Sequence, residues 1–500
     1  MRLIRRQYLG LVPVAILFFI FGTIYSTHSW TSTQQLNKDR WSQRPGDQET
    51  QQYHDGQNYD DPNCADFPRD RLRDIQIVLR IGSTQPFDQI SSHINNITNC
   101  ISNLIVISDR VEEIGNGFWS HDIIADLPKV YWEGIDKDDD ETDQTAGLKA
   151  YANINKGDSS WKQGKHANDR LTHRQGWLLD RFKFLPMVEY AYNVNPSAKW
   201  FYFIEADTYV VWDTLFRLLD QYDPQQQWYF GSPSPGRELN GEKTWFAYGG
   251  NGFILSRTAI QRLVSKDPVK STDESGNANR TELSLTERWA DLVKSDCCGD
   301  SVLGFALANK GVFLSGLYPI FNPHPLHGIP FGPSGKPYWC QPVLSLHKTW
   351  PGDVPGLTQF VKDHTSKQPL VYTDLFKYLN LDQVAQRDDW QNSDWNGFEE
   401  APEAPVHETI EACAAGCHAH GECFQWTYWT ETSWKYKSIP KKKCTFVRSI
   451  RLGTHKDREG SWTTTAVWTS GWDIEKISKW AKDNACGEPE WVEPSLQRIY

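Results

Sequence analysis

Between about residues 73 and 320, apolar residues recur with two different periods, which predicts strands alternating with helices. In Arg73–Gly82 every second residue from Ile75 to Ile81 is apolar, as in a strand. A polar segment follows that can form a helix through Ile90, Ile94 and Ile97, and Asn103–Asp109 predicts a short buried strand. Helices are also predicted over 176–196 and 212–222, strands over 200–204 and 227–232, and a glycine turn, strand and helix over 247–264. This order favours a mostly parallel α/β sheet with helices on both faces.

Two carboxylates, Glu205 and Asp207, follow the buried strand 200–204. Ligand sites in such sheets lie at the carboxyl ends of strands, so a metal site would account for both acids, with oxygen ligands that suit Mn²⁺ or Mg²⁺. A core salt bridge would need a basic partner, and none is near in the sequence. A helix cap would use Asp207 or Asp213 and would leave Glu205 unexplained. The residues alone leave all three roles open.

The N-terminal region contains an uncharged stretch of 18 residues, Tyr8–Tyr25, which is long enough to span a membrane. Three arginines precede it and no Lys or Arg follows until Lys38, which places the N-terminus in the cytosol. A cleaved signal peptide is the alternative, but the apolar stretch is long for one and no clear cleavage site follows. The predicted order is a cytosolic tail (1–7), a transmembrane signal anchor (8–25) and a flexible stem (26–70).

The length of 500 residues predicts two or more domains, and the net charge of −11 without a basic stripe argues against a nucleic-acid partner. Ten cysteines and two N-glycosylation sequons, Asn96 and Asn279, fit an oxidising secretory compartment. The 23 tryptophans and 20 tyrosines are equally typical of a protein that binds sugars and of a protein with a large apolar core. The acidic run 136–144 is interpreted as a solvated loop, with diffuse metal attraction as the alternative.

Beyond about residue 398 a Pro/Glu-rich segment leads into a region rich in cysteine. Cys413 and Cys417 lie one helical turn apart, and Cys423 and Cys444 follow among short aromatic strands. The spacing could also suggest zinc, but an oxidising compartment favours disulfides. We therefore expect a small disulfide-stapled α+β module.

Four segments, in order, resemble motifs of glycosyltransferase family 31, which includes the fringe proteins and core 1 β-1,3-galactosyltransferases. They are "FYFIEADTYVVWDTL" from Phe201, "YGGNGFILSR" from Tyr248, "CCGDSVLGFALANKGV" from Cys297 and "PVLSLHK" from Pro342. The resemblance covers roughly residues 73–355 and implies a GT-A type, Rossmann-like transferase domain (71–375) followed by a linker (376–400). In one departure, Ala206 stands where many relatives have an aspartate.

The resemblance also implies roles for individual residues. Asp207 would ligate the metal directly, His347 would supply an imidazole ligand, and Glu205 would bind ribose or reach the metal through water. Asp300 would be the catalytic base. The residues implied in donor binding are Gly82, Asp109, Lys183, Glu205 and Ala206, and those of a loop close to donor or acceptor are Gly249, Gly250, Asn251 and Gly252.

Each of these roles has a structural alternative. Asp300 could cap a helix, and Asp109 could cap a loop. His347 could be a core histidine, with His324 or His327 as the ligand instead. The glycines could mark only a turn.

The cysteine-rich segment resembles PAN/apple-type modules and is assigned to residues 401–490. That resemblance implies the disulfides Cys413–Cys444 and Cys417–Cys423. Such modules bind proteins or glycans, which suggests recruitment of the acceptor; the alternative is a structural extension of the transferase.

These expectations combine into a single-pass type II membrane protein of the Golgi or ER whose catalytic domain is lumenal. It would be an inverting, Mn²⁺- or Mg²⁺-dependent hexosyltransferase that moves a sugar from a UDP-sugar to a glycan or glycoprotein in β-1,3 linkage. Galactose is the first expectation, as in an N-acetylgalactosaminide β-1,3-galactosyltransferase, with N-acetylglucosamine or glucose next. The alternatives are an inactive relative acting as a chaperone, against which Asp207 and Asp300 argue, and a glycan-binding protein led by the C-terminal module.

Overall fold

The computed structural model describes residues 64–135, 145–155, 171–272, 278–333, 339–364, 367–433, 440–461 and 463–497. The predicted cytosolic tail and anchor, most of the predicted stem and the acidic run 136–144 lie outside these residues. Among the described residues, no helix has the length and apolar character needed to cross a membrane. The anchor at 8–25 therefore stays a prediction.

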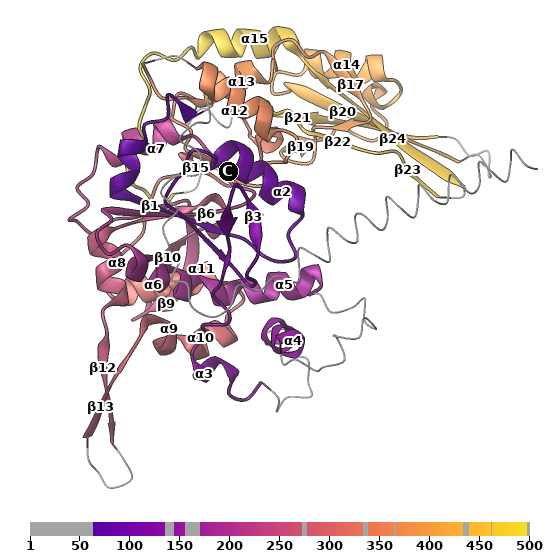
Figure 1. Ribbon diagram of the computed structural model, residues 1–500. Coiled ribbons are helices and arrows are strands. Elements are labelled where there is room, and N and C mark those ends of the chain that lie inside the picture. Colours follow the sequence, from indigo (N-terminus) through magenta and orange to yellow (C-terminus); the bar gives the residue numbers. More distant parts are fainter. Residues whose placement is uncertain are drawn as a thin grey trace, which may run out of the picture.

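Within the described residues, a seven-stranded sheet forms the centre of the molecule (Figure 1). Its spatial order is β14 (Ser315–Gly316), β8 (Tyr229–Gly231), β11 (Phe253–Ser256), β6 (Trp200–Glu205), β1 (Ile75–Arg80), β2 (Leu104–Ser108) and β5 (His121–Asp122). Strand β11 runs antiparallel to β6 and β8, and the remaining pairs are parallel. The expectation of a mostly parallel sheet is confirmed, and the architecture fits a GT-A fold.

Alternate residues of the central strands pack into two separate cores, because successive side chains of a strand point to opposite faces of the sheet. In β6, Trp200, Tyr202 and Ile204 join one core, and Phe201 and Phe203 join the other. The first core is covered by α2 (Phe87–Ser92), α7 (Trp212–Leu219), α12 (Val354–Asp363) and α13 (Tyr372–Tyr378). The second is covered by α6 (Phe184–Val194), α8 (Arg257–Val264) and α11 (Gly299–Asn309). Helices therefore lie on both faces, as predicted.

Smaller elements complete this part of the chain. A three-stranded sheet joins β15 (Phe321–Asn322), β16 (Ser345–Leu346) and β7 (Tyr209–Val210). The hairpin of β12 (Asp267–Thr272) and β13 (Ala278–Leu283) projects from the body in Figure 1. The other elements are η2 (Arg69–Asp74), η3 (His93–Ile97), β3 (Glu113–Gly115), β4 (Phe118–Trp119), α3 (Lys129–Trp132), α4 (Ala146–Asn155), α5 (His173–Asp180), η5 (Arg181–Lys183), β9 (Pro233–Leu239), β10 (Glu242–Ala247), η6 (Gly249–Asn251), α9 (Leu285–Arg288), α10 (Ala290–Ser295) and η7 (Leu326–Gly328).

The C-terminal module is built on a six-stranded antiparallel sheet with α14 (Ile410–Ala419) packed on one face. Its strands are β17 (Gln386–Asp388), β19 (Gly397–Phe398), β20 (Gln425–Ser433), β21 (Lys441–Val447), β23 (Glu459–Gly460) and β24 (Thr464–Trp472). The pair β18 (Trp390–Gln391) and β22 (Thr454–His455), the turn η9 (Pro405–His407) and helix α15 (Ile474–Asp483) complete it. The structure pairs Cys413 with Cys444 and Cys417 with Cys423, as the resemblance implied.

The segment 376–400 differs from the linker that the sequence suggested. Strands β17 and β19 lie within it and pair with β24 and β21 of the module sheet, and β18 pairs with β22. These strands are only two or three residues long, so they carry too few residues to show a period of two. The module therefore begins before residue 401.

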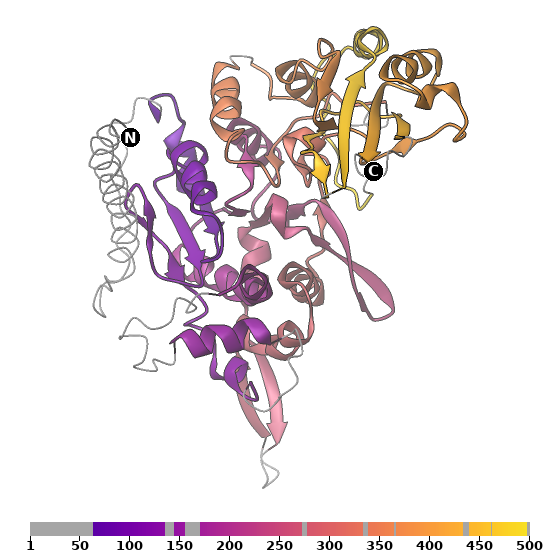
Figure 2. The ribbon, with the colours of Figure 1, turned by 90° about the vertical axis from the view of Figure 1, so that its right-hand side faces the viewer.

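The module shares a core with the larger part of the chain that precedes it, and Figure 2 shows the module against one end of that part. Ile450, Trp472 and Ile477 of the module belong to the same apolar cluster as one face of the central sheet. The indole of Trp480 contacts that of Trp339, with ring centroids 4.7 Å apart. The disulfide Cys340–Cys486 joins the two parts covalently.

Candidate active site

The carboxyl end of β6 carries the two predicted acids. Glu205 is its last residue, and Asp207 lies in the turn that leads to β7. The backbone N–H of Thr349 donates to the Asp207 carbonyl at 2.9 Å, which fixes the segment after β16 against this turn. His347 lies in that segment. Residues 140 positions apart are thus brought together by the small sheet that pairs β7 with β16.

Glu205, Asp207 and His347 form a cluster that can hold a metal ion, since one ligand atom from each lies within 4.8 Å of the others. His347 Nε2 is 3.4 Å from Asp207 Oδ2. Asp207 Oδ1 and His347 Nδ1 are buried and have no hydrogen-bond partner within the described part of the chain. A buried acceptor without a partner is costly, so the site is more stable with a cation beside it. Two carboxylates and an imidazole fit a divalent cation such as Mn²⁺.

The alternative histidine ligands lie elsewhere. The ring of His327 packs against Trp350 with centroids 4.3 Å apart, and neither His327 nor His324 belongs to the metal-type cluster found among the described residues. Burial and, to a smaller extent, the nearby Arg451 lower the pKa of His327 to about 4. His347 is therefore the histidine that the structure places beside Asp207.

Glu205 also has the basic partner that a salt bridge requires. Arg80, the last residue of β1, forms ion pairs with both Glu205 and Asp180, and its guanidinium lies 4.0 Å from the centre of the Phe184 ring. Arg80 is 125 residues from Glu205 in the sequence, so no local pattern indicated it. The only signal was an arginine at the end of a strand in which every other residue except Gln76 is apolar. Because Arg80 already pairs with Glu205, Asp207 is the carboxylate left for a cation.

Asp300 lies at the start of α11, whose N-cap is Cys298, and so occupies the first turn rather than the cap. Its Oδ2 accepts from the Gly249 N–H at 2.9 Å, and its Oδ1 accepts from the N–H of Ser301. Burial raises the pKa of the Asp300 carboxyl, although these hydrogen bonds oppose the change. A carboxylate with a raised pKa is a stronger base than an ordinary aspartate.

The glycine loop lies between Asp300 and the metal cluster. A Cβ on Gly250 would be 2.4 Å from the His347 ring, and one on Gly249 would be 2.8 Å from Phe184 and 3.4 Å from Asp300 Cβ. Gly252 has a φ of +82°, which favours glycine. The amide of Asn251 is buried and has no hydrogen-bond partner in the described structure. Glycine is thus required for close packing here, beyond making a turn.

The residues implied in donor binding form a second cluster at the ends of β1 and β2. Lys183 Nζ donates to Asp109 Oδ1 and to the Ile81 carbonyl, both at 2.8 Å. Asp109 also accepts from the N–H and hydroxyl of Ser83. Burial alone would raise the pKa of Asp109, but Lys183 and Ser83 outweigh it and hold that pKa below its usual value. A Cβ on Gly82 would meet Lys183 Nζ at 3.4 Å, and Ala206 is buried.

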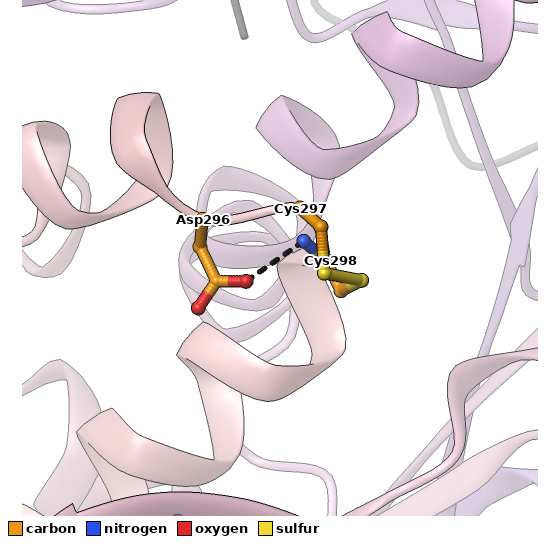
Figure 3. Close-up of side chains that lie close together, drawn as sticks. All are labelled: Asp296, Cys297 and Cys298. Atoms are coloured by element: carbon orange, nitrogen blue, oxygen red, sulfur yellow. Dashed lines mark hydrogen bonds between the residues drawn. A yellow bond between two sulfur atoms is a disulfide. The ribbon is translucent and has the colours of Figure 1, made fainter.

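A disulfide between neighbouring residues, Cys297 and Cys298, stands just before α11 (Figure 3). Asp296 accepts from the Cys298 N–H at 3.0 Å and from Arg237 Nε at 2.6 Å. The two sulfurs are bonded to each other, so these residues do not offer thiolates to a metal. The arrangement fixes the segment that presents Asp300. The adjacent cysteines were visible in the sequence, but their pairing was not predicted.

Comparisons with known proteins point to the same region of the chain. Residues 150–309 match a family described as Fringe-like, a range that includes Glu205, Asp207, the glycine loop and Asp300. This central part of the chain is therefore similar to the fringe-like family. The match ends before residues 401–490, whose resemblance to PAN/apple modules stays a prediction.

Individual relatives share a shorter stretch. The chain is 37% identical over 83 residues to the fringe glycosyltransferase of Drosophila melanogaster, covering 14% of this chain and 20% of that protein. It is 39% identical over 82 residues to the chicken (Gallus gallus) β-1,3-N-acetylglucosaminyltransferase radical fringe and 36% over 81 residues to lunatic fringe of Danio rerio, covering 14% of this chain and 22% of each. The chain thus spans about a fifth of the length of these relatives.

Proposed function

We propose that this protein is an inverting β-1,3-glycosyltransferase that moves a sugar from a UDP-sugar to a hydroxyl group of a glycan or glycoprotein. One observation carries the proposal. Asp207 Oδ1, buried and without a partner in the described structure, lies beside His347 at the strand ends, with Asp300 held across the glycine loop. A carboxylate–imidazole pair next to a separate buried carboxylate suits metal-assisted transfer with a general base.

Each residue has a task in this reaction. A divalent cation held by Asp207 and His347 would neutralise the charge on the departing diphosphate. Asp300 would accept the proton of the attacking hydroxyl, and the Gly249 N–H orients its carboxylate. The pair of Arg80 and Glu205 positions the end of β6 next to the donor. A single displacement of this kind inverts the configuration at the sugar carbon.

The identity of the sugar is revised from the sequence-based expectation. Radical and lunatic fringe are named as N-acetylglucosaminyltransferases, so the relatives give no support to galactose. We therefore place N-acetylglucosamine first and galactose second. The absence of a carboxylate at Ala206 changes the surroundings of the donor but leaves Asp207 in place.

The compartment follows from the cysteines and the N-terminus. All ten cysteines are in disulfides, which form in oxidising compartments. Together with the predicted anchor at 8–25, this supports a type II protein whose transferase faces the lumen of the Golgi or ER. The sequons Asn96 and Asn279 remain candidate glycosylation sites there.

The test uses the full chain with UDP-N-acetylglucosamine, UDP-galactose and UDP-glucose, each with and without Mn²⁺. We expect Mn²⁺-dependent turnover of one donor and its loss in Asp207→Asn. Asp213→Asn is the matched control, because Asp213 lies on α7 with 56% of its side chain exposed and pairs only with Arg217 among the described residues. No turnover of any donor, with the wild type equal to Asp207→Asn, would favour an inactive relative acting as a chaperone.

A further inference from the structure

We propose that the C-terminal module binds a neutral sugar unit of a glycan in a pocket on the face of its sheet opposite α14. The pocket has a volume of about 270 Å³. It is lined by seven side chains from four segments of the module: Gln391, Ser393, Thr427, Trp429, Lys443, Thr445 and Trp468. This site is distinct from the transferase site, and the inference does not depend on the proposed transferase activity.

The alternation of β20 places the pocket on one face of the sheet. Trp426 and Tyr428 join the small core beneath α14, together with the four cysteines of the module. Thr427 and Trp429 therefore point to the other face. Packing beneath α14 accounts for the presence of Trp426 and Tyr428, but it does not account for that of Trp429.

The strand register assembles two rows across this face. Trp429 is opposite Lys443 on β21 and Trp468 on β24. Thr427 is opposite Thr445 on β21. One row thus presents two indoles and the next presents hydroxyls. Gln391, at the end of β18, and Ser393 close a further side of the pocket.

This combination matches the two surfaces of a sugar ring. A pyranose has an apolar face of C–H groups, which can lie against the electron-rich face of an indole, and a rim of hydroxyls that need hydrogen bonds. Trp429 and Trp468 are each only partly buried. The side chains of Gln391, Ser393 and Thr445 make no hydrogen bond to other described residues, whereas the Thr427 hydroxyl already bonds to Asn392 and Ser470.

Charge and size select a neutral, small ligand. Lys443 pairs with Glu399 at 2.7 Å. Lys456, whose Nζ lies 4.9 Å from the centre of the Trp468 ring, pairs with Glu459. Since both lysines beside the pocket are already paired, the pocket offers little attraction to phosphate, sulfate or a uronic acid. Its volume falls just below the range of about 300–1,000 Å³ for small-molecule sites, which suits one sugar unit at the end of a chain.

The test titrates the full chain with galactose, glucose, mannose and N-acetylglucosamine and follows tryptophan fluorescence and saturation-transfer NMR. We expect saturable binding of at least one of them. Trp429→Ala and Trp468→Ala should each weaken it by about tenfold or more, the size of effect expected for a lost aromatic contact. Thr445→Val, which keeps the shape of the side chain, should weaken it by removing a hydroxyl. Phe313→Ala, at a 66% exposed aromatic side chain of the transferase, is the control and should bind as the wild type does.

Two results would overturn the proposal. One is the absence of saturable binding for all four sugars. The other is unchanged binding in Trp429→Ala, Trp468→Ala and Thr445→Val when their circular dichroism and unfolding temperature match the wild type. The proposal is separable from transfer, because Asp207→Asn should still bind the sugar and excess UDP should not compete. Sugar binding without turnover would overturn only the transferase proposal.

Discussion

Lys183 Nζ lies 2.8 Å from Asp109 Oδ1, and the two side chains are only 1% and 2% exposed. The ammonium also lies 3.5 Å from Asp180, which pairs with Arg80, which in turn pairs with Glu205. A continuous series of ion pairs therefore joins Lys183 and Asp109 to the cluster of Glu205, Asp207 and His347. It runs across the carboxyl ends of β2, β1 and β6, the edge at which open α/β sheets generally bind their ligands.

Removing one partner of the buried pair should destabilise the whole fold. Lys183→Met leaves Asp109 as a buried charge without its cation, and we expect a loss of about 3–5 kcal/mol in the free energy of unfolding. Lys199→Met is the matched control, since Lys199 pairs with Asp74 at 2.7 Å but both side chains are about half exposed, and it should cost less than about 1 kcal/mol. Denaturant unfolding measures both. Equal effects of the two variants would contradict a stabilising role for the buried pair.

The two acids after β6 should differ in their effect on metal affinity. Glu205 is already paired with Arg80, so we treat it as a neighbour of the metal rather than a direct ligand. Glu205→Gln should therefore weaken Mn²⁺ binding by about 10-fold. Asp207→Asn changes the carboxylate whose Oδ1 has no hydrogen-bond partner in the described structure, and it should weaken Mn²⁺ binding by more than about 100-fold. Titration calorimetry with Mn²⁺ alone separates the two without an activity assay. A larger loss for Glu205→Gln would reverse the ligand assignment.

A single methyl group at position 250 should reach the metal cluster. In Gly250→Ala the new Cβ would be 2.4 Å from the His347 ring, so the imidazole must move. Because a displacement of about 1 Å can cost a factor of about 100, we expect transfer to fall by about that factor with little change in the unfolding temperature. Gly352→Ala, where a Cβ meets nothing within 4 Å, serves as the control. Normal kinetics in Gly250→Ala would show that His347 is not held in place by this contact.

The pH dependence of transfer should report on Asp300. A general base acts only when it is deprotonated, so activity is present above its pKa and is lost as pH falls through that value. Since burial raises the pKa of Asp300, the acid limb of kcat/KM should lie at a higher pH than for an ordinary aspartate.

The matching variant is Asp300→Asn. It should lower kcat by about 10²–10⁴ and leave UDP affinity unchanged. Asp291→Asn, on the exposed side of α10, should behave as the wild type does. Loss of UDP binding in Asp300→Asn would assign this residue to donor binding rather than to proton transfer.

Much of the fold of residues 73–320 could be predicted because its central strands are long enough to show a period. The strands expected over 73–82 and 103–109 are β1 and β2, and the turn, strand and helix of 247–264 are η6, β11 and α8. The antiparallel direction of β11 was not predicted, since direction depends on how the chain crosses the sheet and not on local apolar pattern.

The site was predicted through short motifs, and its long-range partners were missed. Arg80 is far from Glu205 in the sequence, and Lys183 is 74 residues from Asp109. No local sequence pattern therefore indicated either ion pair. The sequence showed no basic residue near Glu205, and its partner comes from a distant strand. The pocket at Trp429 and Trp468 depends on strand register, which a sequence of mixed aromatic and polar residues does not specify.

The shared core at the boundary of the two parts limits how the chain can be shortened. A chain that stops before Trp480 would lack Cys486 and would leave Cys340 without its disulfide partner. It would also remove Trp480, which fills the space that a side chain at Gly332 would occupy, and so expose Trp339 to water. A late stop codon would then cause the protein to misfold even though every proposed catalytic residue had already been made.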